Sequence, residues 1–425
     1  METYGKILLV AMPAFLVLVL LEKMYGYVKG KDIVRNLDMV SSLSSGVTNV
    51  VKDVLGLSIA ILSYKWLVDR VAMVHMKETW LLYGIAFIVL DFSGYWVHRI
   101  AHKYNFFWNN HIIHHSSEEF NLACALRQSI SVFVKLFTFF LLPAALLGVP
   151  GSVIAMVAPI QLFAQFWYHT QLIDKMGFLE KIIVTPSHHR VHHAINPEYM
   201  DKNYSQIFIL WDKWFGTFQP EIAHIPPVYG ITRPVHSWNP IKINFQHLAL
   251  LIRDAAYTHS IKDKLRIWFM PTGWRPVDAM ERFKINKIED VYHFQKYDTK
   301  ASPGLHVWAW IQLTALLLIV SYLFSNIAAI NKANSWGIYC YGLFVFVMVY
   351  AFTDLMDRST YALIAESSKC ILGLSFIWSQ GSWFLASSWI TNLIAIYLII
   401  SLLVTFLFVW KHYAEDKIET LISLV

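Results

Sequence analysis

The sequence predicts an all-α protein: a multi-span integral membrane helical bundle with a cytosolic helical cap that holds a histidine-rich di-metal site. Of its 425 residues, 56% are hydrophobic and 15% are charged, whereas soluble domains carry about 25% charged residues. The 17 Trp and 21 Tyr residues fit the aromatic belts of membrane proteins. Three histidine-rich groups lie at the end of an apolar run, just after it, and in one long polar loop, which predicts a metal site where the chain leaves the membrane.

The N-terminal part contains three predicted spans, followed by a hairpin. Residues 7–21 are nearly all apolar and lack a clear cleavage site, so we expect an uncleaved anchor rather than a removed signal peptide. Residues 54–68 form a weaker span with charges at its margins, and residues 80–100 form a third span that leads into the first histidines. Two further runs, 129–147 and 153–167, are joined by a Gly-Val-Pro-Gly turn and predict a membrane hairpin.

We expect three regions along the chain. Residues 1–78 hold the N-terminal anchoring spans, and residues 79–302 form the domain that carries the metal site, the hairpin and a polar cap. Residues 303–425 form a C-terminal transmembrane bundle, whose apolar runs are 305–324, 338–352, 370–378 and 390–410. All histidine groups must lie on one side of the membrane for the site to close, and the excess of Lys and Arg in the cap favours the cytosolic side.

The histidine groups have the spacing of metal ligands on helices. His98 and His102 are four residues apart, and the segments 111–115 and 188–193 each contain the pattern HxxHH. Residues three or four apart share one helix face, so each group can direct two or three imidazoles at one point. Eight imidazoles suit two ions better than one, and imidazole without thiolate favours iron, zinc, copper or nickel. The predicted ligands are His98, His102, His111, His114, His115, His169, His189, His192 and His193, with His188 as a further candidate.

A single histidine beside an apolar helix is usually a hydrogen-bonded polar residue and not a ligand. Three groups at repeated spacing do not fit that interpretation, because each unpaired buried imidazole would cost about 1–3 kcal/mol. For His169, which follows the last run of the hairpin, metal ligation and a plain hydrogen bond are both open.

Asp91 lies inside the third predicted span, seven residues before His98. An intramembrane carboxylate is costly and usually functional. We expect Asp91 to accept the outer N–H of a ligating imidazole. The alternative is a carboxylate that snorkels toward the membrane surface or forms an ion pair with Arg99 or Arg127.

The rest of the composition narrows the possible functions. The net charge of +6 suits a basic face near anionic lipid, and no separate basic motif predicts nucleic-acid binding. The three Cys residues form no CxxC pair, and the chain has no dinucleotide- or phosphate-binding glycine motif. An electron donor would therefore come from outside the chain. Oxygen activation on a lipid fits an all-histidine pair of ions. Two-metal hydrolysis and metal transport, which places its ligands across several spans, are the alternatives.

Four segments resemble the fatty acid hydroxylase/sterol desaturase superfamily of membrane di-iron enzymes. They read DFSGYWVHRIAH, FFWNNHIIHHSSEEFNL, TPSHHRVHH and DKNYSQIFILWDKWFGTF, and they cover residues 91–218. The resemblance implies two iron ions held by His98, His102, His111, His114, His115, His189, His192 and His193.

Within this superfamily, the segments HHSSEEFNLACALRQS and FWYHTQLI and the apolar C-terminal third resemble an ether-lipid-cleaving branch. That resemblance implies a lipid substrate (an alkylglycerol or lyso-ether lipid), tetrahydrobiopterin as the reductant and an endoplasmic reticulum membrane. The alternative is a sterol or fatty-acyl hydroxylase or desaturase supplied by cytochrome b5. Glu119 and Arg127 could contact the pterin or the head group, or could form a salt bridge that ties the cap to the third span. The oligomeric state is left open.

Overall fold

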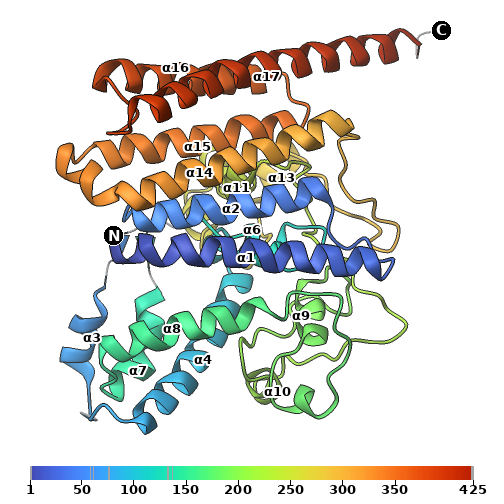
Figure 1. Cartoon of the computed structure of the whole chain (residues 1–425). Helices are drawn as coiled ribbons and strands as arrows, with labels where there is room; N and C mark the ends of the chain where they lie inside the picture. Colours follow the sequence, from blue (N-terminus) through green and yellow to red (C-terminus); the bar gives the residue numbers. More distant parts are fainter. Residues whose placement is uncertain are drawn as a thin grey trace.

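Layers of helices build the molecule in the computed structural model (Figure 1). The structure describes residues 2–57, 59–60, 62–74, 77–131, 134–135 and 137–422. Six helices run alongside one another in the upper layers: α1 (Glu2–Val28), α2 (Asn36–Val54), α14 (Pro303–Ala333), α15 (Gly337–Met356), α16 (Ala362–Gln380) and α17 (Ser388–Ile422). The largest apolar core joins α1 and α2 to α14–α17.

The lower part contains α3 (Tyr64–Val71), α4 (Trp80–Lys103), η2 (Phe137–Leu141), α7 (Leu142–Leu146) and α8 (Gly151–Phe166). The strands β1 (Ile59–Ala60) and β2 (Val134–Lys135) form one short parallel pair. The remaining elements are short, apart from α11, and they build the cap: α5 (Asn105–Trp108), α6 (Ile112–His115), η1 (Cys124–Leu126), η3 (Gly177–Lys181), α9 (Pro186–His193), α10 (Leu210–Trp214), α11 (Pro240–Tyr257), α12 (Ile261–Arg266) and α13 (Val277–Arg282).

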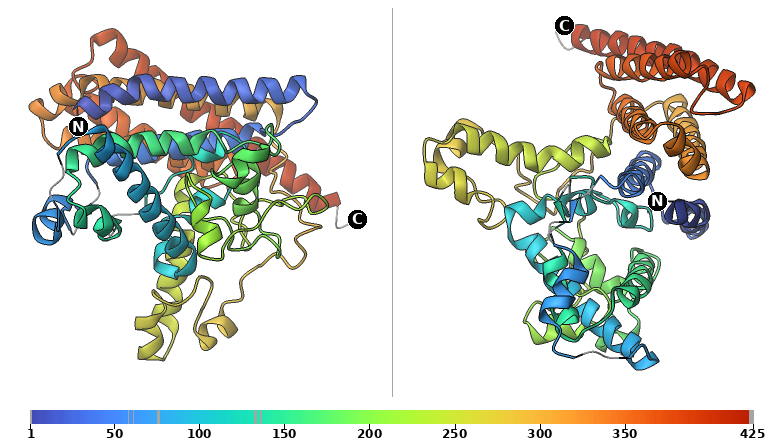
Figure 2. Two further views of the ribbon diagram at one scale, coloured as in Figure 1. Left: turned by 90° about the horizontal axis from the view of Figure 1, so that it is seen from below. Right: turned by 90° about the vertical axis from the view of Figure 1, so that its left-hand side faces the viewer.

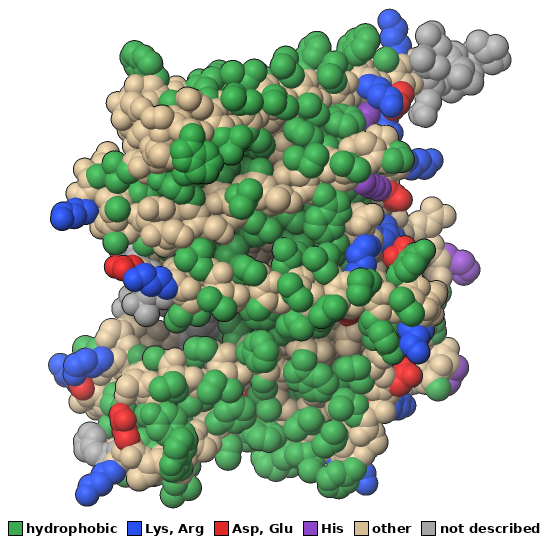
Figure 3. Space-filling model, viewed as in Figure 1, with side chains coloured by type: hydrophobic (Ala, Val, Ile, Leu, Met, Phe, Trp, Pro, Cys, Tyr) green, Lys and Arg blue, Asp and Glu red, His purple; other side chains and the backbone are tan. Residues whose placement is uncertain are grey.

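The predicted fold class is confirmed. Six of the described helices are long and apolar enough to cross a membrane: α1, α4, α14, α15, α16 and most of α17. On the face shown in Figure 3, hydrophobic side chains cover the middle, while Lys, Arg, Asp and Glu gather toward the two margins. An apolar band between charged margins is the surface expected of an integral membrane protein.

The second predicted span was wrong. Residues 54–68 contain the end of α2, a turn and the start of the short helix α3, and residues 58 and 61 lie outside the described part of the chain. The element that packs into the bundle is instead α2, which begins at Asn36. Its buried face contains five Ser or Thr residues, and these polar residues lower its hydropathy while their small size allows close helix packing. A Cβ at Gly46 would lie 3.1 Å from the carbonyl oxygen of Leu126.

The predicted hairpin is a strongly bent pair rather than two straight spans. Its first run is mostly η2 and the short helix α7, and residues 132, 133 and 136 lie outside the described residues. The chain bends by 119° between the segment that includes α7 and the helix α8. The boundaries 1–78, 79–302 and 303–425 stay a prediction.

Local sequence explains where several helices begin. The Thr79 hydroxyl accepts a hydrogen bond from the backbone N–H of Leu82 at the start of α4. Ser302 does the same for Leu305 at the start of α14, where Pro303 occupies the first helical position. Both are preferred N-terminal arrangements because they satisfy or remove backbone donors that have no partner inside the helix.

Candidate metal centre

Nine histidines converge in two adjacent groups on the cap side of α4. One group contains His98, His102, His111, His115 and His192, and the other contains His114, His169, His189 and His193. Within each group the candidate ligand atoms lie within 4.8 Å of one another. Each group therefore has the size and composition of a site for one ion.

Four separate segments supply these side chains. The end of α4 supplies two, the turn and helix α6 supply three, the residue that follows α8 by a short turn supplies one, and α9 supplies three. Each group combines histidines from the first half of the domain with histidines from α9. The prediction that all three motifs lie on the same side of the membrane is thus met by the geometry.

Backbone carbonyl groups fix how the imidazoles point. His98 Nδ1 lies 2.7 Å from the oxygen of Tyr204, His192 Nδ1 lies 2.9 Å from that of Lys202, and His169 Nδ1 lies 2.9 Å from that of Gln165. A carbonyl can only accept, so each Nδ1 carries the hydrogen and each Nε2 offers a lone pair. These Nε2 atoms face into the groups.

The Nε2 atoms approach one another closely. The His98 and His111 Nε2 atoms are 2.8 Å apart, and those of His189 and His169 are also 2.8 Å apart. In addition, His102 Nε2 is buried and has no hydrogen-bond partner among the described residues. Several lone pairs directed at one small volume repel each other unless a cation lies between them, so both groups fit metal ions.

The buried imidazoles are neutral. Burial, together with the neighbouring histidines, lowers the pKa of His111, His115 and His189 well below the usual value. Burial also lowers the pKa of His114 to about 3. Neutral imidazole is the form that binds a metal ion, so these side chains need no deprotonation at neutral pH.

His188 belongs to neither group. It is the third residue of α9, and its side chain and that of Thr185 form a reciprocal capping arrangement at the start of this helix. His188 directly precedes the candidate ligand His189 in the sequence, but on the helix its side chain points away from both histidine groups.

The predicted contact of Asp91 was wrong. Its carboxylate accepts hydrogen bonds from the backbone N–H groups of Ile207 and Phe208 at 2.9 and 3.0 Å, and from Trp211 Nε1 at 2.7 Å. It contacts neither an imidazole nor Arg99 or Arg127 through these bonds. Asp91 instead holds the chain just after Tyr204, whose carbonyl orients His98.

A second carboxylate holds the same turn. Asp212 accepts from the backbone N–H groups of Tyr204 and Ser205, both at 2.8 Å, and from the Thr217 hydroxyl at 2.6 Å. Asn203 takes a positive φ of 55° here, a conformation that Asn tolerates better than most residues. The turn at Asn203 thus places the carbonyl groups of Lys202 and Tyr204 against His192 and His98.

Glu119 and Arg127 form ion pairs beside the centre. Arg127 Nη2 lies 2.7 Å from Asp38 Oδ1, and Glu119 accepts from Arg35 at 2.5 Å and from Lys296 at 2.7 Å. These pairs tie the second histidine motif to the start of α2 and to the chain before α14. The predicted tie to the third span was therefore wrong, because the partners lie on other segments.

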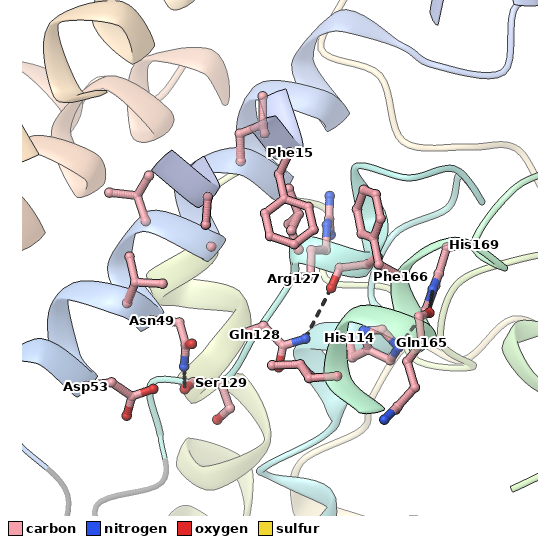
Figure 4. Close-up of a pocket in the computed structure, with 18 of the residues that line it drawn as sticks. Phe15, Asn49, Asp53, His114, Arg127, Gln128, Ser129, Gln165, Phe166 and His169 are labelled. Atoms are coloured by element: carbon pink, nitrogen blue, oxygen red, sulfur yellow. Dashed lines mark hydrogen bonds between the residues drawn. The ribbon is translucent and has the colours of Figure 1, made fainter. Parts of the chain in front are cut away.

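A cavity of about 620 Å³ reaches both histidine groups. Side chains of α1 and α2 form one wall, and at its edge Phe166 of α8 packs against Phe15 of α1, with ring centroids 4.7 Å apart (Figure 4). His114 and His169 lie at one side of this space, while Asn49 and Ser129 lie at the other. The cavity is mainly apolar, and its polar groups lie beside the histidines and beside Asn49 and Ser129.

Glu22 is a further residue of the site that sequence analysis missed. It lies on α1, is buried, and accepts hydrogen bonds from the backbone N–H of Leu122 and the hydroxyl of Thr170, both at 2.6 Å. Thr170 directly follows His169, so α1 holds one side of the four-histidine group. The sequence signal that could have identified Glu22 is a carboxylate within an apolar membrane helix, the same signal that identified Asp91.

The model of the fatty acid hydroxylase family matches residues 83–217, which include all nine histidines. This match, the apolar helices and the histidine groups define a membrane oxidoreductase of the fatty acid hydroxylase class.

Relatives with similar sequences identify the family within this class of oxidoreductases. Alkylglycerol monooxygenase from Homo sapiens is 34% identical over 367 residues, which are 86% of this chain and 81% of the relative. The proteins of the same name from Xenopus tropicalis and Danio rerio are each 32% identical, over 85% of this chain and 79% and 80% of the relative. The chain belongs to the alkylglycerol monooxygenase family, and it is a lipid monooxygenase. A comparison with solved structures found no match.

Proposed function

We propose that this enzyme cleaves the ether bond of alkylglycerols and lyso-ether lipids by hydroxylating the carbon next to the ether oxygen. Its cofactors are two iron ions, and its co-substrates are O2 and tetrahydrobiopterin. The observation that carries the proposal is the mainly apolar cavity that ends at both histidine groups. The names of the relatives support the choice of substrate.

The donor set suits iron. Each group offers four or five neutral imidazoles and no thiolate, and imidazole binds iron, zinc and copper. Among these metals, the redox chemistry of a pair of iron ions serves an oxygenase. Bound iron supplies the activation of O2 for attack on a C–H bond. The protein fixes the imidazoles through the carbonyl groups of Tyr204, Lys202 and Gln165.

The cavity suits a lipid with one alkyl chain. Its volume is about 620 Å³, which lies within the range of about 300–1,000 Å³ typical of small-molecule sites. Leu8, Met12 and Phe15 of α1 and Leu43 and Val47 of α2 provide an apolar wall for this chain.

The reaction balances with one two-electron donor. One oxygen atom of O2 enters the C–H bond next to the ether oxygen, and the other leaves as water with two protons and two electrons from the reductant. The product is a hemiacetal. Its C–O bond to the glycerol oxygen then breaks as the hydroxyl proton moves to that oxygen, which gives a fatty aldehyde and a glycerol derivative.

The polar residues beside the cavity have separate proposed roles. Arg127 lines both the lipid cavity and a small polar pocket formed with Glu118, His236 and Trp238. We assign Arg127 and the neighbouring Glu119 to contacts with the pterin or the lipid head group. Asp91 acts as a positioning residue through the turn that it holds. The excess of Lys and Arg in the cap supports a metal site that faces the cytosol. The membrane that we propose is that of the endoplasmic reticulum.

The test uses the full-length protein in lipid nanodiscs with ferrous iron, O2, tetrahydrobiopterin and a 1-O-alkylglycerol. We expect release of a fatty aldehyde that requires all four components. The matched control is the 1-acylglycerol of equal chain length, in which the corresponding carbon is a carbonyl carbon and carries no hydrogen to replace. A product that forms only from a sterol or an acyl lipid with cytochrome b5 would contradict the proposal.

A further inference from the structure

Residues 257–287, called here the arm, project away from the stacked helices together with the outer end of α11 (Figure 2). Three large apolar side chains at spacings of four residues are exposed on it: Ile261 (74%), Leu265 (70%) and Phe269 (65%). Val277 and Met280 add further exposed apolar surface on α13. Together these five side chains form an exposed apolar surface on the polar cap.

The inner base of the arm is attached to the end of one candidate span. The backbone N–H groups of Asn105 and Phe106 donate to the carbonyl oxygens of Met270 and Trp268 at 3.0 and 2.8 Å. The N–H of Thr272 donates to the carbonyl of Lys103 at 3.0 Å, and Lys103 is the last residue of α4. The arm therefore begins at the level where a membrane span ends.

The start of α11 is attached to the end of a second span. Lys242 pairs with Asp354, and the backbone N–H of Trp238 donates to Asp357 Oδ1 at 2.6 Å. Both carboxylates lie at the end of α15. Since α4 and α15 both end beside the structure that carries the arm, the arm lies at the level of the membrane–water interface.

The composition of the arm indicates lipid rather than protein as the occupant. It contains seven Lys or Arg and three Asp or Glu residues, and Lys262, Arg282 and Lys284 are exposed. Lysine is depleted in the cores of protein interfaces. Cations beside Leu, Phe and Trp are typical of segments that lie on anionic membranes.

We propose that the arm rests in the surface of the bilayer, with its apolar side chains among the upper acyl chains and its cations against anionic head groups. Through residues 268–272, this contact supports the chain that connects His102 to His111. The arm is a second membrane contact beside the spanning helices, and it does not depend on which lipid the enzyme oxidises.

The first test measures depth in the full-length protein. A nitroxide is attached at Leu265→Cys, and collision rates with O2 and with a water-soluble nickel chelate are compared in phosphatidylcholine–phosphatidylserine nanodiscs. The control label is at Glu289→Cys, an exposed polar position of the cap, and the labelled parent gives the background from native cysteines. We expect the Leu265 label to favour O2 and the Glu289 label to favour the nickel chelate. Equal access to the nickel chelate would overturn the proposal.

The second test removes charge. The double variant Lys262→Gln/Lys284→Gln should reduce the fraction of Leu265 label in lipid, by about fivefold in the docking equilibrium for each lysine. In nanodiscs of phosphatidylcholine alone, the parent and the variant should be alike. An unchanged fraction in anionic nanodiscs would contradict the charge contribution. A dimer that becomes a monomer with Leu265→Asp would assign this surface to a second copy and overturn the proposal.

Discussion

The metal centre and the C-terminal bundle of α14–α17 both bury polar side chains, but they satisfy them differently. In the bundle, Lys369 and Glu366 form an ion pair at 2.6 Å, and the same lysine donates to Ser401 at 2.9 Å. Ser401 and Tyr397 in turn bond to Gln312. These groups are partners for one another, and the network is closed within the protein.

The metal centre leaves its polar atoms open toward one another. The Nδ1 atoms of His98, His169 and His192 find carbonyl groups, while their Nε2 atoms face other imidazoles at close range. Burial alone therefore does not identify a functional site. A functional site is distinguished by how its buried polar groups are satisfied. In the bundle they bond to one another, whereas the imidazole lone pairs of the metal centre need a cation.

The largest effect should follow from removing a ligand of the metal centre. His189→Ala takes away an imidazole that lies 2.8 Å from His169 Nε2 and 3.1 Å from His193 Nε2. We expect loss of one of two metal ions and of detectable hydroxylation, with membrane insertion unchanged. Metal analysis and aldehyde release measure this. His306→Ala on α14 is the control, and full metal occupancy in the His189 variant would remove it from the ligand set.

The second largest effect should come from the Glu366–Lys369 pair of the C-terminal bundle. It should change the stability of the protein and leave its metal content unchanged. Glu366 and Lys369 are almost completely buried, and their charged groups lie 2.6 Å apart. Lys369→Met should lower the free energy of unfolding by about 3–5 kcal/mol, because it leaves a buried charge alone.

The double variant Glu366→Leu/Lys369→Met sharpens this expectation. Replacing both charges by apolar groups should restore most of the lost stability. Denaturant unfolding of the detergent-solubilised protein gives both values, and metal content should equal that of the parent throughout. If the double variant were as unstable as Lys369→Met, the other polar contacts of Lys369, rather than its charge, would account for the loss.

The sequence allowed prediction of what depends on local spacing. Histidines four residues apart, such as His98 and His102, share a helix face whatever lies around them, so the ligand groups were visible before the fold. The long spans were also predictable, because a long apolar run is a local feature of the sequence. The helix α2 was missed because its buried face is rich in Ser, which an apolar pattern does not reveal.

The contacts around the ligands were not predictable from spacing. The partners of Asp91 lie 116–120 residues further along the chain, and two of its three bonds go to backbone groups that carry no side-chain identity. The same holds for Tyr204, which orients His98 through its carbonyl oxygen. Such contacts require the tertiary arrangement.

A smaller effect is expected from the support of the open site. Asp91→Asn keeps the size of the side chain but replaces one acceptor oxygen by a donor, which cannot pair with the N–H groups of Ile207, Phe208 and Trp211. The turn that orients His98 should loosen, and metal affinity should fall about 10–100-fold, as for other residues that orient ligands. Titration of metal into the apo protein measures this. An affinity equal to that of the parent would mean that Asp212 alone holds the turn.

The smallest effect should separate the cavity from the metal centre that it serves. Val47 of α2 lines the apolar part of the cavity and is nearly fully buried. Val47→Phe should shorten the available space and lower kcat/KM for long alkyl chains by about tenfold, while short chains and metal content are unaffected. Val10→Phe on the exposed side of α1 is the matched control. Equal losses for all chain lengths would place the alkyl chain elsewhere, and the cavity would then be a route to the metal and not a measure of the substrate.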